Sequence, residues 1–287
     1  MLSIICPIYN ARPYLDRLLP SLKHQDYTGE FEVLIVDNRS TDGSAALCRA
    51  AGFTVLSCTH VASSYAARNV GLAAARGEVV ALIDADCAAE HDWLRRGVGH
   101  LTDSGADFVA GNVLFEFRNP RSPWELLEAA LHMDNRALAT SGRAVTANLF
   151  VRRGLYDRVG FYREDQVSGE DVAWSQRAVR SGATLSYCPD AIVYHPTRDA
   201  KESIRKAVRV GRGMFAHKQS AYGFGVLKRV LRVVFPPPVA PALRALRRNG
   251  WNKRSYQVVG PLWILSICKA IGMIWEAMRR ARSRVVS

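Results

Sequence analysis

The segment SYAARNVGLAAARGEVVALIDADC, residues 64–87, joins a helical pattern to an apolar strand that ends in two aspartates. Gly77 follows the helical part, as glycine commonly does at a helix C-terminus. The run at 79–84 is continuously apolar up to Asp84, which is typical of a parallel strand that is covered on both faces. Asp84 and Asp86 thus stand at the mouth of a buried strand, where they either cap a helix or hold a ligand.

The same alternation of apolar runs and helical patterns extends across the first 115 residues. Strands are predicted at 2–6, 32–37, 53–58, 79–84 and 107–115, and helices near 13–24, 42–51, 64–75 and 90–102. Such alternation is typical of βαβ units. We therefore expect an α/β fold with a mixed, largely parallel sheet that is flanked by helices.

The rest of the chain is less regular. A helix is predicted at 122–138, a strand at 144–153, a helix at 169–182, and two short strands at 183–189 and 191–195. From about residue 200 the sequence becomes basic and helical. The predicted division is a globular domain at 1–199, with halves at 1–115 and 116–199, and a basic helical extension at 200–287.

The net charge of +13 is concentrated in this extension. Residues 201–287 hold 19 Lys and Arg against 2 acidic residues, whereas the preceding part holds 20 basic and 24 acidic residues. This asymmetry indicates a polyanionic partner, either a nucleic acid or an anionic membrane surface. No helix-turn-helix, zinc-finger or RNA-binding signature is present, so we expect no nucleic-acid partner.

The last helical segment carries an apolar stripe. A helical wheel groups Trp263, Ile267, Ile271, Ile274 and Met278 on one side. Such a stripe packs on its own chain or on the partner of a homodimer, or it lies in a membrane interface, which tryptophan anchors and a dense Arg/Lys face favour. No run of 18 uncharged apolar residues occurs, so a transmembrane helix is not predicted.

The six cysteines and the N-terminus indicate the compartment. No Cys-x-x-Cys pair occurs, so neither a zinc ribbon nor a disulfide framework is predicted. The N-terminal MLSIICPIYN enters a strand directly, and no signal peptide is predicted. We expect a cytoplasmic protein that is peripherally associated with the inner face of the cell membrane.

Polar residues follow three of the predicted strands. Pro7, Tyr9 and Asn10 follow the first, Asp37 to Asp42 the second, and Asp84 and Asp86 the fourth. In open α/β sheets, ligands bind beyond the carboxyl ends of the strands. Carboxylates gathered there repel one another unless a cation neutralises them, and Mg²⁺ or Mn²⁺ is usually bound by one or two carboxylates together with substrate phosphates. The pattern therefore predicts a metal–diphosphate site.

Taken together, these motifs resemble those of family 2 glycosyltransferases, which are inverting enzymes with a GT-A fold. The resemblance rests on CPIYN (6–10), VDNRSTDGS (36–44), residues 64–87, and SGEDVAWSQRAVRSGATLSYCPDAIVYH (168–195). It covers about the first 195 residues, in the right order and spacing. It implies that 1–115 bind a nucleotide-sugar, and that 116–199 bind the acceptor and supply the catalytic base.

The resemblance also implies a role for each matching residue. Pro7, Tyr9 and Asn10 line the nucleoside pocket, with Tyr9 against the base; Asp37 accepts a hydrogen bond from the base or ribose; Arg68 lies close to the nucleotide; Asp84 faces the ribose or sugar; Asp86 holds Mn²⁺ or Mg²⁺; and His195 approaches the metal or the diphosphate. The alternative for His195 is a purely structural hydrogen bond.

The family pattern makes Asp171 the catalytic base and Glu170 a helper that orients the acceptor or the base. An inverting transfer needs a carboxylate to accept the proton of the acceptor hydroxyl. The alternative is that the Ser168-Gly-Glu-Asp segment is only a helix N-cap. Both can hold, because a helix start also places its side chains.

Two departures from the family narrow the expected function. The chain lacks the Gln-x-x-Arg-Trp sequence of processive members and a bundle of transmembrane helices, which argues for the addition of a single sugar. Asn38 stands where many relatives have a second aspartate, which puts the contact to the base in doubt.

The resulting expectation is a metal-dependent, inverting hexosyltransferase. It would move one sugar from a nucleotide-diphosphate sugar, with UDP the commonest nucleotide in the family, to a glycan or lipid-linked acceptor in cell-surface or exopolysaccharide synthesis. The alternative is a sugar nucleotidyltransferase of similar α/β build, although PIYNARP (7–13) lacks the glycine-rich loop of those enzymes.

Overall fold

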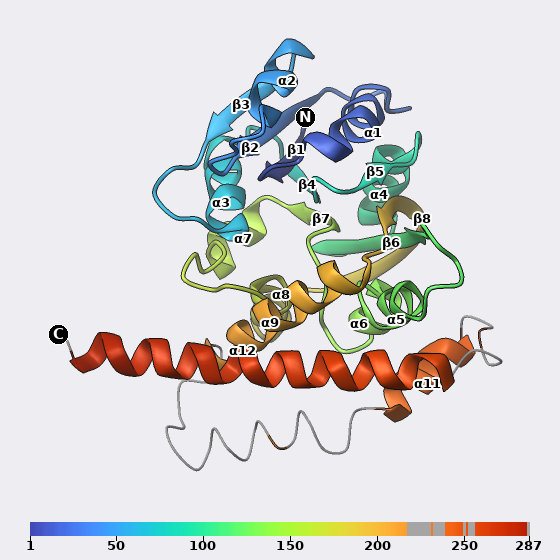
Figure 1. The fold of residues 1–287 in the computed structure, drawn as a ribbon. Coiled ribbons are helices and arrows are strands. Elements are labelled where there is room, and N and C mark those ends of the chain that lie inside the picture. The colour runs from blue at the N-terminus through green and yellow to red at the C-terminus, as the bar shows by residue number, and fades with distance from the viewer. Residues whose placement is uncertain (217–230, 232–238, 249–250, 252–255, 286–287) are drawn as a thin grey trace. The chain divides into compact units, whose positions relative to one another are not determined.

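The structure is a computed structural model, and it describes residues 1–216, 231, 239–248, 251 and 256–285 of the 287-residue chain (Figure 1). The chain divides into two compact units. Unit 1 comprises Met1–Glu116, Met133–Asp165 and Glu170–Pro196, and unit 2 comprises Phe117–His132, Gln166–Gly169 and Thr197–Ser287. The longest segment of unit 2 thus begins close to the predicted boundary at residue 199, and the unit also takes in 117–132.

Unit 1 contains the whole sheet. Its strands are β1 (Leu2–Ile8), β2 (Phe31–Asp37), β3 (Thr54–Ser57), β4 (Val79–Ile83), β5 (Ala88–Ala89), β6 (Phe108–Glu116), β7 (Asn148–Arg152) and β8 (Leu185–Pro196). Its helices are α1 (Arg12–Lys23), α2 (Ser44–Ala50), α3 (Ser64–Ala74), α4 (Trp93–Asp103), α6 (Asn135–Ala139), α7 (Gly154–Val159) and α8 (Glu170–Arg180).

The eight strands form one mixed sheet in the order β3-β2-β1-β4-β7-β6-β8-β5. Four of its seven pairings are parallel, and the three that involve β7 or β5 are antiparallel. The predicted α/β fold with a mixed, largely parallel sheet is therefore confirmed. The sheet changes direction at β7, which lies between β3, β2, β1 and β4 on one side and β6, β8 and β5 on the other.

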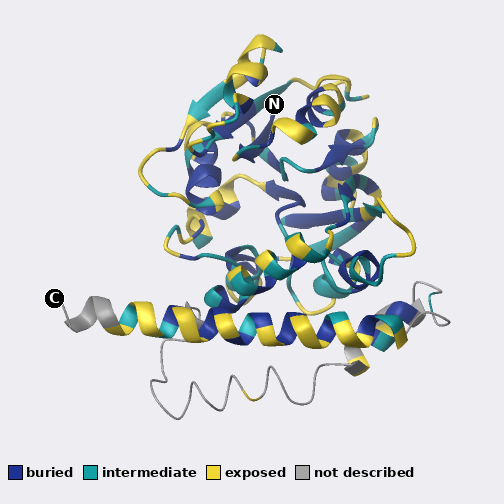
Figure 2. Cartoon of the chain, in the orientation of Figure 1, coloured by how far each residue is buried: buried dark blue, intermediate teal, exposed yellow. Residues whose placement is uncertain are grey.

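Helices cover both faces of this sheet, which explains the continuous apolar runs. Along β4, Ala81 and Ile83 pack in a core cluster with α1 and α4, whereas Val80 and Leu82 pack in a second cluster with α3 and α8. Figure 2 shows the central strands as buried along their length. A strand that is buried on both faces leaves only its carboxyl end for polar residues.

The structure corrects two element predictions. The helix predicted at 122–138 is two helices, because Met133 takes a positive φ of 54° and Asp134 starts a new helix by accepting a hydrogen bond from Ala137 N (2.9 Å). The two strands predicted at 183–195 are one strand, β8. A register shift opposite Gly111 and Asn112 of β6 accommodates the irregular stretch at Pro189.

Unit 2 is helical among its described residues. It contains α5 (Pro123–Leu131), α9 (Ala200–Ala216), α11 (Val239–Arg248) and α12 (Val259–Val285). Two glycines let α9 and α12 touch: a Cβ on Gly211 would lie 2.0 Å from Lys269 O, and one on Gly272 would lie 2.1 Å from Val208 O. Apolar side chains of all four helices form the core of this unit.

Candidate functional site

The carboxyl ends of β1, β2 and β4 lie at one edge of the sheet. The parallel register pairs Ile8 with Asp37 and Ile5 with Leu82, so the loops after these three strands begin side by side. The candidate site is built from these loops, from α3 and α8, and from the end of β8. All of these elements belong to unit 1.

Asp84 and Arg68 form an ion pair at this edge. The Arg68 side chain is almost fully buried, and its Nη1 also donates to Ser64 O (3.3 Å) one turn earlier on α3. A buried guanidinium needs a carboxylate partner, and the helix–strand segment at 64–87 supplies both. Arg68 therefore holds Asp84 in place, in addition to the expected position close to the nucleotide.

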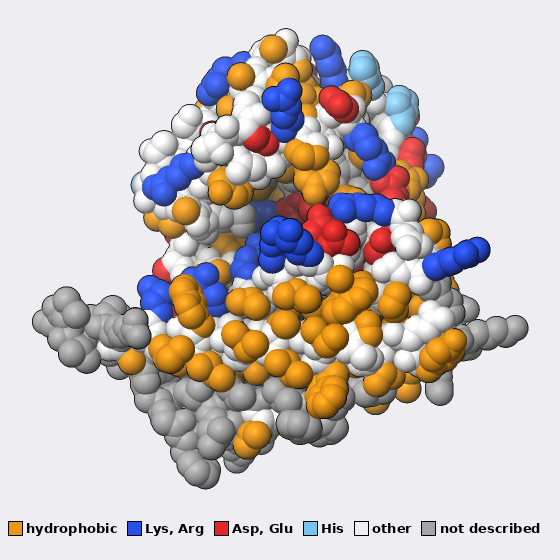
Figure 3. All heavy atoms as spheres, viewed as in Figure 1, with side chains coloured by type: hydrophobic (Ala, Val, Ile, Leu, Met, Phe, Trp, Pro, Cys, Tyr) orange, Lys and Arg blue, Asp and Glu red, His pale blue; other side chains and the backbone are white. Residues whose placement is uncertain are grey.

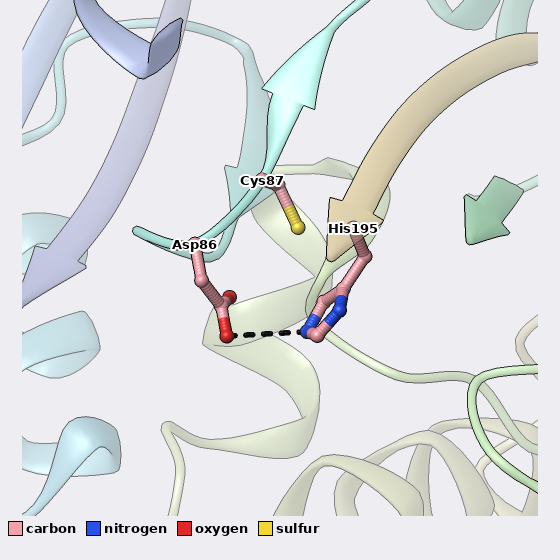
Figure 4. A group of neighbouring side chains, drawn as sticks. All are labelled: Asp86, Cys87 and His195. Carbon is pink, nitrogen blue, oxygen red and sulfur yellow. Dashed lines mark ion pairs between the residues drawn. The ribbon is translucent and has the colours of Figure 1, made fainter. Parts of the chain in front are cut away.

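Asp86 faces His195 across the site. Oδ2 of Asp86 lies 3.2 Å from Nε2 of His195, whose side chain is buried at the end of β8 (Figure 4). The Sγ atom of Cys87 completes a group whose ligand atoms all lie within 4.8 Å of one another. The structure thus brings together the two residues that were expected at the metal.

The hydrogen bond at Nδ1 of His195 limits Nε2 to two states. Nδ1 lies 2.6 Å from the carbonyl oxygen of Pro196. A carbonyl oxygen only accepts hydrogen bonds, so Nδ1 carries the proton. Nε2 then either carries a second proton or directs a lone pair toward Asp86, and a lone pair beside a carboxylate is favourable only with a cation between them.

The donor set combines a carboxylate oxygen, the ligand type that suits Mg²⁺ and Mn²⁺, with an imidazole nitrogen, which suits zinc, iron and nickel as well. A divalent cation fits this pair, and the backbone carbonyl that holds Nδ1 is a usual outer partner of a ligating histidine. Burial, together with the nearby charges of Asp86 and Asp84, raises the pKa of the Cys87 thiol well above its ordinary value. Without a bound metal, Cys87 is therefore a neutral thiol beside Asp86 and His195.

Asp171 lies in the first turn of α8 and is tied to α3. The hydroxyl of Tyr65 donates to Asp171 Oδ1 (3.4 Å) and accepts from the backbone N–H of Glu170 (3.1 Å). Burial raises the pKa of Asp171, and the charge of Arg68 partly opposes this shift. A carboxylate with a raised pKa is a stronger base than an exposed aspartate.

Glu170, the neighbour of Asp171, is directed elsewhere. Its fully buried carboxylate accepts from Arg163 N (3.0 Å) and pairs with Nη1 of Arg177 (2.7 Å). These contacts join the start of α8 to its last turn and to the preceding loop. The expected role of Glu170 in orienting acceptor or base stays a prediction, and its observed contacts are structural.

The residues expected in the nucleoside pocket surround the β1 and β2 loops. Pro7 is buried within β1, and Tyr9 is 67% exposed. Asn10 has a positive φ of 48°, and its Oδ1 accepts from Thr41 N (2.8 Å), so it fixes the facing loop. Asp37 closes β2 and accepts from Ser40 N (3.3 Å).

A nearby aspartate that the sequence grouped with this edge has another task. Asp42 accepts from the backbone N–H groups of Arg12 and Ser44 (both 3.0 Å), which caps the starts of α1 and α2. Hydrogen bonds from Ser44 and Arg12 outweigh burial and lower the pKa of Asp42. Asp42 therefore serves the two helix starts, which removes one carboxylate from the group that the sequence placed at this edge.

Sequence reasoning missed two residues of the site. Tyr65 stands three positions before Arg68, so the helical period places both on one face of α3. That signal was present in the segment at 64–87. Cys87 follows Asp86 directly, and no pattern separates it from the other buried cysteines of the chain.

Comparisons with known proteins agree with this geometry. Residues 3–160 match the model of glycosyl transferase family 2. The chain is 34% identical over 279 residues to glycosyltransferase AglE of Haloferax volcanii, covering 93% of this chain and 92% of that protein. It is 31% identical to the pre-mycofactocin glycosyltransferase of Mycobacterium tuberculosis, over 68% of this chain and 43% of that one.

Two solved structures share the fold. The mannosyltransferase PcManGT of Pyrobaculum calidifontis, in complex with GDP-Man and Mn²⁺, superposes with a TM-score of 0.68 at 19% identity, covering 96% of this chain and 87% of that one. Residues 1–349 of TarS from Staphylococcus aureus, in complex with UDP-GlcNAc, give a TM-score of 0.55 at 20% identity, with 98% and 92% covered. With the family match across more than half of its length, the chain belongs to glycosyltransferase family 2 and is a glycosyltransferase.

Proposed function

We propose that this enzyme moves a single sugar from a nucleotide-diphosphate sugar to a hydroxyl group of a glycan or lipid-linked acceptor, with inversion at the anomeric carbon. Residues 1–115 bind the donor, and residues 116–199 present the acceptor and the base. The family membership and the polar edge of β1, β2 and β4 support this assignment. Cell-surface or exopolysaccharide synthesis is the setting we infer.

The observation that carries the proposal is the Asp86–His195 pair. Its carboxylate oxygen and imidazole nitrogen face each other at 3.2 Å, and the Pro196 carbonyl fixes the imidazole. We assign these two residues as ligands of Mn²⁺ or Mg²⁺. When bound there, such a cation supplies positive charge to the departing diphosphate. Arg68 and Asp84 then hold the sugar side of the same edge.

The transfer itself requires one base. In our proposal, the Asp171 carboxylate accepts the proton of the acceptor hydroxyl while that oxygen forms its bond to the anomeric carbon. The bond from the anomeric carbon to the β-phosphate oxygen breaks on the opposite side, and the nucleoside diphosphate leaves with the electron pair. Tyr65 orients the base through its hydroxyl.

The donor is a UDP-sugar in our proposal, with a GDP-sugar as the nearest competitor. TarS was solved with UDP-GlcNAc and PcManGT with GDP-Man, so the shared fold accommodates both nucleotides. Exposed Tyr9 supplies an aromatic face for either base. A thermal-shift panel of nucleotide-sugars with Mn²⁺ ranks them, because a bound ligand stabilises the fold in proportion to its affinity.

We further propose that α12 attaches the enzyme peripherally to the cytoplasmic face of the membrane. Among its exposed side chains are those of the predicted stripe: Trp263, Ile267, Ile271, Ile274 and Met278, of which Ile271 is 54% exposed. Figure 3 shows hydrophobic side chains gathered over this helix. By length and composition, Tyr256–Ala281 could also cross a membrane. The backbone contact of Gly272 with α9 favours an interfacial position, because it ties one face to protein.

The test is an assay for the released nucleotide. The full chain is incubated with labelled nucleotide-sugars and Mn²⁺, with and without EDTA, and the products are separated. Release of nucleoside diphosphate that EDTA abolishes is the expected result. Release of pyrophosphate would establish the nucleotidyltransferase instead, and turnover that is insensitive to EDTA would remove the metal from the proposal.

A further inference from the structure

Strand β8 of unit 1 contains a bulge in its parallel pairing with β6. Gly111 of β6 pairs with Cys188 of β8. Asn112, the next residue of β6, pairs with Ile192, so three residues of β8, at 189–191, are looped out of the ladder. A bulge disrupts the ladder locally and leaves backbone groups that need other hydrogen-bond partners.

The bulge determines where His195 lies along the sheet. Beyond it, Phe115 of β6 pairs with His195, and the centroids of the two rings lie 5.4 Å apart. If the earlier register of β6 and β8 continued without the bulge, Phe115 would pair with Ile192 instead. His195 would then lie three residues further along, which is about 10 Å at roughly 3.3 Å per residue of a strand. That displacement would take the imidazole away from Asp86, whose carboxylate it meets at 3.2 Å.

The side chain of Asn148 holds this bulge. Asn148 lies on β7 and is fully buried. Its Nδ2 donates to Asn112 O and to Ala191 O (both 2.8 Å), so it reaches one carbonyl on each strand of the bulged pair. Its Oδ1 accepts from Nε1 of Trp93 on α4 (2.9 Å). Both N–H groups and the carbonyl of the amide are thus engaged, and together they join β6, β8 and α4.

Neighbouring residues make room for this amide and support it. A Cβ at Gly111 would lie 2.3 Å from Asn148 Oδ1, so glycine is needed where the amide lies against β6. A second buried amide, that of Asn135, donates to Gly111 O (2.9 Å) and to the backbone carbonyl of Asn148 (3.3 Å). Its Oδ1 accepts from Val145 N (3.1 Å). Buried polar networks whose members are all hydrogen-bonded specify one arrangement of the surrounding backbone.

The backbone of Asn148 lies beside the strand that leads to the other member of the metal pair. In the antiparallel pairing of β4 with β7, Asn148 is the partner of Ile83, the residue before Asp84. Asp86 follows in the loop that begins there. One residue therefore adjoins the strand that leads to Asp86 and supports the strand that carries His195.

We propose that Asn148 is a positioning residue for the metal pair: its buried amide holds the bulge of β8 and thereby sets the register that brings His195 to Asp86. It acts through the backbone of β6 and β8 and not as a ligand. This inference rests on the proposed function, because the metal pair is part of that proposal.

The experiment measures the Mn²⁺ affinity of the full chain in the presence of UDP or GDP, by the electron paramagnetic resonance signal of the free ion. Asn148→Ala removes both donors to the bulge and should weaken Mn²⁺ binding by about tenfold or more, as changes around metal ligands commonly do. Nucleotide binding without metal, measured by calorimetry in EDTA, should stay nearly unchanged. Val151→Ala is the matched control, because it removes buried volume from the same strand and should lower the melting temperature without changing the Mn²⁺ affinity.

A second variant covers the case in which Asn148→Ala does not fold. Asn148→Asp keeps the volume of the side chain but turns an acceptor toward the same two carbonyls, and it should weaken Mn²⁺ binding likewise. Wild-type Mn²⁺ affinity in a folded Asn148 variant, or an equal loss in Val151→Ala, overturns the positioning role. His195→Ala separates this result from a failure of the proposed function: if that variant binds Mn²⁺ as the wild type does, the metal site and the inference both fail.

Discussion

His195 Nε2 and Asp86 Oδ2 lie 3.2 Å apart, although β8 and the loop after β4 are far apart in the sequence of unit 1. The Pro196 carbonyl holds the opposite nitrogen, so the imidazole is oriented before any ligand arrives. This pre-orientation makes the pair a testable metal site.

His195→Ala and Asp86→Asn should each weaken the Mn²⁺-dependent binding of the donor by about tenfold or more, because each removes one of the two ligands that we propose for the ion. The measurement is the Mn²⁺ concentration at which a nucleotide-sugar raises the melting temperature. His91→Ala, which changes an exposed histidine away from the pair, is the control. Equal Mn²⁺ dependence in wild type and in His195→Ala would assign His195 a structural role.

Asp171→Asn should keep donor affinity and reduce transfer by about 10²–10⁴-fold, since the amide cannot accept the acceptor's proton. Donor binding is read by calorimetry and transfer by release of the nucleoside diphosphate. Asp165→Asn, an exposed neighbour, serves as the matched control. Full activity of Asp171→Asn would mean that another group is the base.

The same substitution should raise the melting temperature at pH 7. Burial raises the pKa of Asp171 in the folded state above its unfolded value, so ionising this group costs folding free energy. The cost is present above the folded pKa and disappears below the unfolded pKa of about 3.9. The gain in Asp171→Asn should therefore vanish as the pH falls toward that value, as melting curves across pH can show.

Tyr65→Phe tests how the base is positioned. The hydroxyl donates to the charged form of Asp171, so its loss should raise the pKa of that carboxyl further. The acid limb of the pH–rate profile should then move to higher pH, with kcat reduced more than KM is changed. A lower kcat with an unshifted profile would show that Tyr65 only supports the packing of α8 against α3.

Glu170→Gln separates a structural role from a catalytic one. The buried carboxylate pairs with Arg177 and accepts from Arg163 N, so the variant should lose about 1–3 kcal/mol of unfolding free energy. Glu116→Gln, which breaks a surface pair with Arg17, should cost about 1 kcal/mol or less. Chemical denaturation measures both. A stable but inactive Glu170→Gln would support the catalytic role that the family pattern implies.

The sequence predicted those parts of the site that depend on short-range order. Arg68, Asp84 and Asp86 lie within one helix–strand segment, residues 64–87. Its apolar pattern identifies the helix and the strand, and so places the two aspartates directly after the strand. The direction of the Glu170 side chain could not be read in this way, because it depends on how α8 packs against the loop at Arg163. Helical spacing places Tyr65 on the same face of α3 as Arg68. Its contact with Asp171 depends on how α3 and α8 pack together, which the sequence does not show.

The helices and strands of the fold were also predicted unevenly from the sequence. Apolar runs located every strand of the parallel half, because burial on both faces leaves a continuous signal. The break between α5 and α6 was not predicted, because methionine is not a residue that usually takes a positive φ, as Met133 does here.

The apolar face of α12 yields the last prediction. Replacing Trp263, Ile271 and Ile274 by serine should leave the melting temperature nearly unchanged, because each side chain is 41% or more exposed. If each contributes about 1 kcal/mol of membrane burial, the partition into anionic vesicles should fall on the order of 100-fold. Sedimentation with vesicles measures this. Retained sedimentation would exclude the face as the membrane contact, and conversion of a dimer into a monomer would identify it as an interface between two copies. The exposed Leu47→Ser variant, which changes an apolar residue of unit 1, controls for a general loss of hydrophobicity.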